Sequence, residues 1–335
     1  MRANGQIIVA VDAAGGDYAP QEVVRGAAAA AEEYGVHVVL VGRKALLEKL
    51  IRRYPVEPGL TLIEATEVIG CNESPVQAVR SKPDSSIVVG TSLVHDGFAS
   101  AFVSAGNTGA VVSSAFLTLE RIEGVQRPAL CSVVPVDSAN PALLIDVGAN
   151  VDCRPDFLVQ FAQLATIFAR GVLGIDSPRV GLLNGSEERI ESNLLAKESF
   201  RLLKKTNLNF VGNVGGQEIL TGKADVIVTD GFTGNVVIKT IEGLADTVQN
   251  LLTADKAFEI ARDLEGAALV HYTKLATMVG RLDYKAYGGA CLLGINGNIV
   301  VAHGRSRAKA FKNAIHLAYK AAEAGVVQAI RGGMR

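Results

Sequence analysis

The sequence predicts a three-layer α/β/α sandwich, and two patterns indicate this fold class. Short apolar runs alternate with helical stretches along nearly the whole chain, as in a sheet covered by helices on both faces. The apolar runs do not alternate strictly with polar residues, which is typical of strands buried on both sides. With 335 residues, the chain fits one large domain or two modest ones. We expect a single domain spanning residues 1–335.

The first half of the chain opens with a β-branched strand at 6–12, followed by a helix that Pro20 begins and Gly35 ends, since proline favours the start of a helix and glycine its end. The strands and helices expected next are strands 36–42, 61–65 and 100–105, and helices 44–53, 84–96 and 108–121. The runs 129–136 and 142–148 follow each other so closely that we expect them to pair antiparallel.

The second half continues with helix 155–170, strand 179–184, helix 187–205, strands 209–213 and 225–229, and helix 234–252. A stretch near 244–287 follows that interrupts the alternation of strands and helices. It is mixed in charge and helical in pattern. We expect its residues 253–280 to leave the sandwich as a helical excursion. A hairpin around Asn296-Gly297-Asn298 and a final helix at 306–324 complete the fold.

Five of the apolar runs lead straight into small, polar, glycine-bearing loops. The five segments are 7–20, 101–110, 143–150, 181–188 and 226–235. Such loops expose backbone N–H groups, and glycine lets the chain approach a ligand closely. Because the carboxyl ends of parallel strands converge on one crevice, we expect one shared site, suited to an anion such as phosphate.

Composition argues against several other classes of function. The formal net charge is −1, there is no Trp, and aromatic residues make up 5%, so nucleic-acid binding is not expected. Four cysteines without CxxC spacing indicate neither a metal site nor disulfides, and HExxH, GxSxG, Walker A and GxGxxG motifs are absent. We therefore expect no cofactor. With no signal peptide and no span of ~18 apolar residues, a cytoplasmic protein is expected, at most peripheral to a membrane.

Three helix starts offer candidate anion-binding groups. One helix begins near Thr108, a second carries Lys239 about one turn after GFTGN, and a third follows HGRSRAK with His303 and with Ser306 as a plausible N-cap. Helix N-termini attract anions through free N–H groups and the helix dipole. Each loop alone fits an ordinary turn or helix cap better than a site, whereas the five loops together favour a site. Asp230 ends a strand directly before Gly231, and Asp146 ends one two residues before Gly148, which fits either a turn or a site residue.

Long motifs in fixed order resemble the bacterial phosphate acyltransferases that make acyl-phosphate from acyl-[acyl carrier protein] for phospholipid synthesis. The segments that carry the resemblance cover almost the whole chain and are 11–27, 103–110, 121–130, 144–162, 177–188, 224–243 and 283–315. The resemblance implies an isocitrate/isopropylmalate-dehydrogenase-like fold shared with phosphate acetyltransferases. It also implies a homodimer, no metal or organic cofactor, and a product passed to a membrane glycerol-3-phosphate acyltransferase.

Phosphate can itself attack a thioester carbonyl, so the reaction that the resemblance implies needs no nucleophile from the protein. The residues we expect to be catalytic are Asp146, Asn184, Asp230, Lys239 and His303. The residues we expect to bind phosphate are Gly106, Asn107, Thr108, Gly109, Asn235 and Ser306. Asn184 is expected on the thioester side, and the two aspartates are expected to orient Lys239, His303 or loop amides, or to accept a proton from phosphate.

The chain departs from the family pattern at two charged positions. Glu191 stands where the family usually has Lys, and Gln217 where it usually has Arg. The loss of these two charges leaves a catalytically weakened scaffold for lipid synthesis open as an alternative. A phosphate acetyl- or butyryltransferase acting on coenzyme A thioesters is a second, independent alternative. The departures at Ala14 and Cys291 fit packing differences.

The stretch near 244–287 is expected to contact other molecules. Residues 244–280 are more apolar than a solvated excursion requires, which favours a homodimer. Residues 253–277 mix apolar and basic side chains, which fits reversible contact with a membrane surface. An acidic acyl carrier protein is expected to dock on clustered cations, for which the candidates are Lys256, Arg262, Lys274, Arg281 and Lys285.

Overall fold

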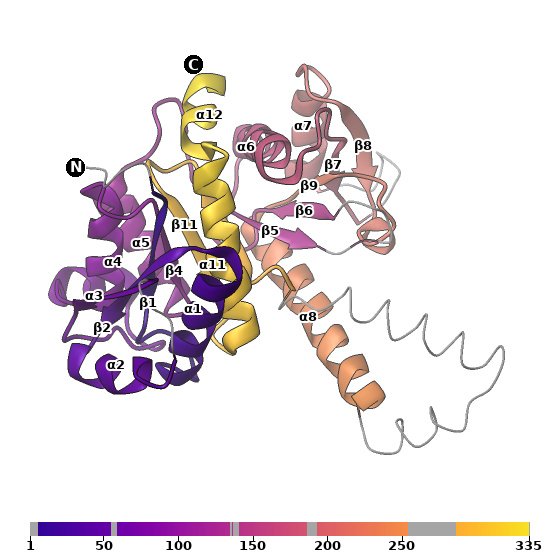
Figure 1. The fold of residues 1–335 in the computed structure, drawn as a ribbon. Coiled ribbons are helices and arrows are strands. Elements are labelled where there is room, and N and C mark those ends of the chain that lie inside the picture. Colours follow the sequence, from indigo (N-terminus) through magenta and orange to yellow (C-terminus); the bar gives the residue numbers. More distant parts are fainter. Residues whose placement is uncertain are drawn as a thin grey trace, which may run out of the picture.

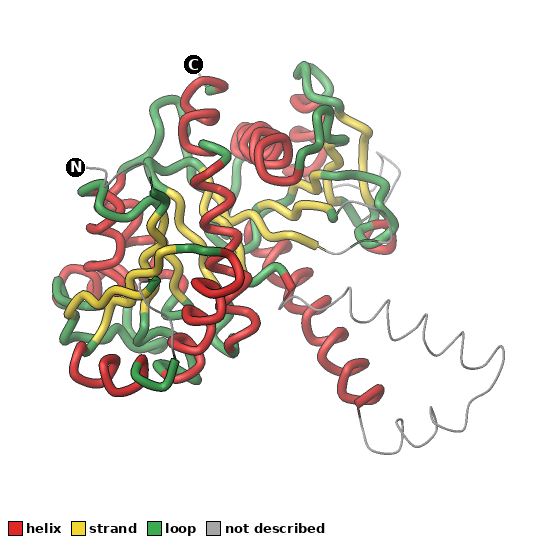
Figure 2. The backbone as a smooth tube through the Cα atoms, viewed as in Figure 1, coloured by secondary structure: helices red, strands yellow, loops and turns green. Residues whose placement is uncertain are grey.

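The computed structural model describes residues 6–54, 59–134, 136, 141–185, 193–253 and 286–334. Within these ranges the strands form one eleven-stranded sheet in the order β3-β2-β1-β4-β11-β10-β5-β6-β9-β7-β8, seen in Figures 1 and 2. The strands are β1 (Ile8–Asp12), β2 (His37–Gly42), β3 (Leu60–Glu64), β4 (Ala101–Ser104), β5 (Ala129–Val134), β6 (Ala142–Ile145), β7 (Val180–Leu183), β8 (Phe210–Val214), β9 (Val226–Val228), β10 (Gly289–Leu293) and β11 (Asn298–Ala302).

Helices cover both faces of this sheet, so the predicted three-layer α/β/α sandwich is confirmed. The described helices are α1 (Gln21–Tyr34), α2 (Lys44–Ile51), α3 (Pro75–Ser81), α4 (Ser86–His95), α5 (Thr108–Leu119), α6 (Pro155–Leu173), α7 (Leu194–Leu203), α8 (Gly231–Thr253), α11 (Ala308–Glu323) and α12 (Val326–Gly333). Helices α1, α2, α6, α7, α11 and α12 share one apolar core with the sheet. Helices α3, α4, α5 and α8 pack on the opposite core.

The sheet reverses direction near its middle. β1, β2, β3, β4 and β11 are mutually parallel. β10 pairs antiparallel with both β11 and β5, and β5 pairs antiparallel with β6. β9, β7 and β8 then run parallel to β6. The strands of the second half consequently point opposite to those of the first half. The expectation that all five glycine-bearing loops follow parallel strands ending at one edge is therefore wrong.

Most predicted elements are confirmed, including the antiparallel pairs β5–β6 and β10–β11. The first helix lies where Pro20 and Gly35 placed it, and Gly35 adopts φ 64°, the left-handed conformation that glycine allows without steric cost. Two short helices were missed, α3 and α12. α8 begins three residues earlier than predicted, and the described part of α7 begins at Leu194 rather than at 187.

α6 is the one described helix that is long and apolar enough to cross a bilayer, judged by length and composition. It is 56% buried inside the structure, and Phe161, Leu164 and Phe168 pack in the core beneath the sheet. The first residue of the predicted excursion at 253–280 is Thr253, the last residue of α8. The rest of it, with its proposed membrane and carrier-protein contacts, lies outside the described residues.

Candidate functional site

A cavity of about 130 Å³ lies between the sheet and the first half of α8. Four residues predicted for the site line it, and they come from three separate segments: Thr108 begins α5, Asn235 and Lys239 lie on α8, and His303 directly follows β11. Glu242 joins them from the next turn of α8. The floor is formed by Leu130, Ser132, Val133, Val147, Tyr287, Gly288, Gly289, Ala290, Val301 and Ala302, and Ile238 and Ile241 also line the cavity.

α8 brings these residues together by crossing the sheet. It follows β9 in the second half, packs against β5 and β6, and reaches His303, which follows β11 in the first half. Figure 1 shows α8 starting beside β5 and β6 and then extending away from the rest of the molecule. The site therefore forms where a helix bridges two sets of oppositely directed strands, and not at a common strand edge.

The start of α8 is fixed by its own capping groups. The Asp230 carboxylate accepts hydrogen bonds from Thr233 N at 2.9 Å and Thr233 Oγ1 at 2.7 Å, which makes Asp230 the N-cap. Gly231 N donates to Asn150 O at 2.8 Å. A carboxylate at this end also interacts favourably with the helix dipole. Asp230 therefore positions α8, which carries Asn235 and Lys239.

His303 and Glu242 face each other across the cavity, with His303 Nε2 at 3.4 Å from Glu242 Oε2. Burial lowers the pKa of His303, and the positive charges of Arg305 and Lys239 lower it further. Burial also raises the pKa of Glu242 to about 7, and nearby Asp246 adds to the rise while Arg305 and Lys239 oppose it. Both shifts favour the neutral form of the group concerned.

Asp146 is fully buried and holds its own loop. Its carboxylate accepts hydrogen bonds from five donors: Leu130 N (2.9 Å), Gly148 N (3.2 Å), Ala149 N (3.0 Å), Asn150 N (2.7 Å) and Asn150 Nδ2 (2.8 Å). Of the expected roles for Asp146, the orientation of loop amides matches these contacts. It does not line the cavity, although Val147 beside it does.

A second cavity, of about 250 Å³, lies on the other side of α8. Asn184, Asp230 and Thr233 give it polar groups, together with Asn193, the N-cap of α7. Its remaining wall is largely apolar and includes Leu158, Leu182, Leu183, Leu195 and Val237. Positions 233 and 237 of α8 face this cavity, whereas 235, 239 and 242 face the first. Asn184 and Asp230 are consequently separated from Lys239 and His303 by the body of α8.

The loop after β4 contributes less to the first cavity than predicted. Gly106 N donates to Ser104 Oγ at 3.0 Å. The Asn107 side chain caps α5 by accepting from Ala110 N, and its amide donates to the carbonyls of Gly70, Cys71 and Glu73 at 3.2 Å each. Gly109 packs closely against Pro75 of α3. Of the four residues 106–109, only Thr108 lines the cavity.

Asp12, at the end of β1, supports this loop from below. It is buried, and it accepts hydrogen bonds from Ser104 Oγ at 2.7 Å and from Ala14 N at 3.0 Å. Burial raises the pKa of Asp12, and the hydrogen bonds oppose that rise. Gly15 lies so close to Gly106 N that a Cβ atom would clash there. The loops after β1 and β4 thus form one packed unit that fixes the start of α5.

Ser306 is not an N-cap, contrary to the prediction. α11 begins at Ala308 with Arg307 as N-cap, and Ala308 N donates instead to Glu22 Oε2 at 2.9 Å. Ser306 is buried, its backbone N–H bonds to His303 O at 2.8 Å, and its Oγ has no hydrogen-bond partner in the described part of the chain. The sequence placed Ser306 near the site but could not show that Glu22, distant in sequence, caps the helix.

Sequence reasoning missed Glu242. A signal was present, because Glu242 lies three residues after Lys239 and therefore on the same face of a predicted helix. Gln217 is exposed in the short 3-10 helix Gly216–Glu218, whose Gly216 lines the second cavity. Glu191 lies outside the described residues, as do Lys256, Arg262, Lys274, Arg281 and Lys285.

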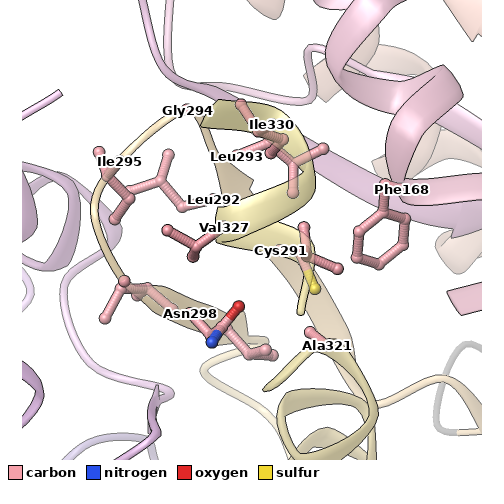
Figure 3. Close-up of a pocket in the computed structure, with 14 residues that line it drawn as sticks. Phe168, Cys291, Leu292, Leu293, Gly294, Ile295, Asn298, Ala321, Val327 and Ile330 are labelled. Carbon is pink, nitrogen blue, oxygen red and sulfur yellow. The ribbon is translucent and has the colours of Figure 1, made fainter. Parts of the chain in front are cut away.

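Neither a metal site nor the pocket around Cys291 is a candidate for the functional site. Among the described residues, no group of three His, Cys, Asp or Glu side chains is placed to hold a metal ion. Figure 3 shows a pocket around Cys291 that is lined almost entirely by apolar side chains such as Phe168 and Ile330. Its volume is about 10 Å³. This is barely the space of one water molecule, and burial raises the pKa of Cys291 to about 12. Cys291 is therefore a packing residue.

The comparisons with known proteins agree on a family and a fold. The model of the family described as fatty acid synthesis protein matches residues 7–329. A phosphate acyltransferase from Dehalococcoides mccartyi is 48% identical over 320 residues, covering 96% of this chain and 92% of that protein. Among solved structures, a phosphotransacetylase from Streptococcus pyogenes superimposes with a TM-score of 0.63 at 18% identity, covering 96% and 94% of the two chains.

A 4-hydroxythreonine-4-phosphate dehydrogenase from Klebsiella pneumoniae superimposes with a TM-score of 0.54 at 14% identity, covering 96% of this chain and 99% of that one. At such identities the two structures show the fold alone. They place the sandwich in a fold class that acyl-transferring and dehydrogenase proteins share, as the sequence predicted.

Proposed function

The chain belongs to the phosphate acyltransferases of the fatty acid synthesis protein family, and on this premise we propose that it moves a fatty acyl group from acyl carrier protein to inorganic phosphate in the cavity beneath α8. The observation that carries the proposal is the meeting of Thr108, Asn235, Lys239 and His303 around one cavity. These residues combine a cation, three side chains that can donate hydrogen bonds, and the start of α5.

The reaction needs positioning more than covalent help. A phosphate oxygen attacks the thioester carbonyl, a C–O bond forms, and the C–S bond breaks to release the carrier thiol. Holding phosphate against the carbonyl can supply roughly 7–11 kcal/mol of the barrier reduction. In this proposal Lys239 and Asn235 hold the anion, and each well-aimed donor to the oxyanion contributes about 3 kcal/mol more.

The second cavity is suited to bind the acyl thioester. Its leucine-rich wall offers an apolar surface, while Asn184, Asn193 and Thr233 supply polar groups at its rim. An acyl chain gains from apolar burial at about 25 cal/mol per Å². We place the acyl donor on this side of α8 and phosphate on the other, so that the two reactants approach each other around the N-terminus of the helix.

Partners are proposed on the same premise. Acyl carrier protein docks on the basic residues of 256–285, residues 253–277 rest reversibly on a membrane surface, and the acyl-phosphate passes to a membrane glycerol-3-phosphate acyltransferase. The working location is the cytoplasm.

Liposome flotation tests the membrane contact. Leu264→Glu with Leu269→Glu is expected to abolish flotation while the oligomeric state is retained, and unchanged flotation contradicts the proposed membrane contact.

Product analysis tests the proposed activity. Purified protein is incubated with palmitoyl-acyl carrier protein and phosphate, and acyl-phosphate is trapped with hydroxylamine as the hydroxamate. Hydroxamate that depends on phosphate is expected. Acetyl-coenzyme A in place of the carrier thioester separates the alternative short-chain reaction, which the phosphotransacetylase likeness favours at the level of fold only. No product with either donor contradicts both and leaves the scaffold alternative.

A further inference from the structure

Glu242 is the acidic group of the phosphate cavity that the proposed function leaves without a role. Its side chain is 13% exposed, lines the cavity, and lies 3.4 Å from His303 Nε2. Lys239 lies three residues earlier on α8 and lines the same cavity. An acid beside the expected position of a phosphate dianion repels it when ionised. A carboxylate at this place therefore calls for a chemical explanation.

The contacts of His303 define its hydrogen-bonding state. Arg305 N donates a hydrogen bond to His303 Nδ1 at 3.2 Å, so Nδ1 is the acceptor and Nε2 carries the hydrogen of the neutral ring. The Nε2–H group then faces the Glu242 carboxylate. Burial and the charges of Arg305 and Lys239 lower the pKa of His303, which keeps the ring neutral. His303 is thus placed to hold Glu242 and has no free nitrogen with which to accept a proton itself.

The surroundings of Glu242 keep its proton exchangeable near neutral pH. Burial and Asp246 raise its pKa to about 7, against the opposing charges of Arg305 and Lys239. Arg305 is in turn shared with Asp246, whose carboxylate lies 3.6 Å from the guanidinium, and Asp17 acts on His303 from the loop after β1. The Tyr287 phenol also lines this wall of the cavity.

We propose that Glu242 is the proton-carrying residue of the acyl transfer and that His303 is the positioning residue that holds its carboxylate. The inference rests on the proposed function. As a phosphate oxygen forms its bond to the acyl carbon, Glu242 accepts the proton of the phosphate hydroxyl. As the C–S bond breaks, its electron pair goes to sulfur, the thiolate takes up a proton from water, and Glu242 returns its proton to water. The step ends with acyl-phosphate, a free thiol and Glu242 ionised again.

The proposal sets the direction of the pH dependence. Glu242 must be ionised to accept the proton, and the bound phosphate dianion opposes that ionisation. The rise of kcat with pH at saturating phosphate is therefore expected above about 7, the pKa that Glu242 has in the protein without phosphate, with a plateau at higher pH. A measurement of kcat reports groups in the substrate complex. In Glu242→Gln this rise is expected to vanish, and kcat at pH 8 is expected to fall by about 100-fold or more, within the usual range for general acid–base groups.

Phosphate affinity separates this role from a merely structural one. Glu242→Gln removes a negative charge beside the anion, so its dissociation constant for phosphate, measured by calorimetry, is expected to stay equal or to become smaller. Calorimetry in two buffers of different ionisation enthalpy should show proton uptake when the wild-type protein binds phosphate at pH 7.5, and no uptake by the variant. Glu242→Asp, which keeps a carboxylate, should recover part of kcat. Glu48→Gln, an exposed change on α2, is the matched control.

Different failures overturn different claims. If the wild-type protein forms no acyl-phosphate, the proposed function falls, and this step falls with it. If wild type is active but Glu242→Gln retains kcat within twofold and the same pH profile, the role of Glu242 is wrong while the function stands. A joint loss of kcat, phosphate affinity and melting temperature in the Gln variant would show that Glu242 only maintains the structure, which also overturns the proposal.

Discussion

Lys239 is the clearest single cation of the proposed phosphate site, because it lines the cavity from the third turn of α8. Lys239→Ala is expected to lower kcat/KM for phosphate by about 10- to 100-fold, since a hydrogen bond to a charged group contributes about 1.5–3 kcal/mol. Lys239→Arg should retain more activity than Lys239→Ala. Steady-state kinetics with varied phosphate makes the measurement, and exposed Lys49→Ala on α2 is the control. Unchanged phosphate kinetics in Lys239→Ala would place the anion elsewhere.

Asp146 is a predicted site residue whose contacts indicate a role in the stability of the fold. Because five donors converge on this buried carboxylate, Asp146→Ala leaves several of them without partners. We expect a loss of at least about 3 kcal/mol in the free energy of unfolding, measured by urea denaturation. Asp152→Ala, an exposed neighbour, should change it by less than about 0.5 kcal/mol. Equal effects of the two substitutions would contradict this role.

Among the elements, β7 and β9 of the second half are linked by an ion pair just before the two strands begin. Arg179, just before β7, donates to Asp225, just before β9, through Nε at 3.0 Å and through a terminal nitrogen at 2.8 Å. Burial disfavours the ionised Asp225, but the hydrogen bonds and charge of Arg179 outweigh it, so the pKa of Asp225 lies below its ordinary 3.8. The pair therefore stabilises the fold while Asp225 is ionised.

The lowered pKa of Asp225 predicts how the free energy of unfolding depends on pH. A lowered folded pKa contributes stability above the unfolded pKa and loses it as pH falls through the folded value. Asp225→Asn should lower the free energy of unfolding by about 1 kcal/mol at pH 7, a modest figure because Arg179 is partly exposed to solvent. The difference from wild type should shrink below pH 4. Urea denaturation at several pH values checks this, and a difference independent of pH would contradict it.

The elements also show what the sequence can and cannot predict. Apolar runs and glycine or proline positions located nearly every strand and long helix, because those signals are local. The reversal of the sheet depends on β10 pairing with β5, two strands far apart in sequence that no local pattern connects. For the same reason the sequence put Asn184 and Lys239 in one crevice, whereas α8 separates them. α3 and α12 are each at most eight residues long, which is about two turns of helix and gives only a weak helical period.

For the whole molecule, we predict a homodimer that covers the outer face of α8. Phe232, Val236 and Leu244 are 63%, 52% and 55% exposed, and such apolar groups on one helix favour burial in an interface. Light scattering at micromolar concentration should give twice the chain mass of 35.1 kDa. Phe232→Glu with Val236→Glu should shift the protein toward monomer, whereas Leu46→Glu on α2, an equally apolar exposed site, should not. A monomeric wild-type protein would contradict the prediction.

The central claim is that phosphate reacts in the cavity beneath α8, and a crystal structure with phosphate and a non-reactive acyl thioester analogue tests it most directly. The account predicts an ordered phosphate within hydrogen-bond distance of Lys239 and Asn235, close to Thr108 and Glu242, with the acyl chain on the Asn184 side of α8. A phosphate bound beside Asn184 and Asp230 instead, with the cavity at Lys239 and His303 holding only water, would contradict the account.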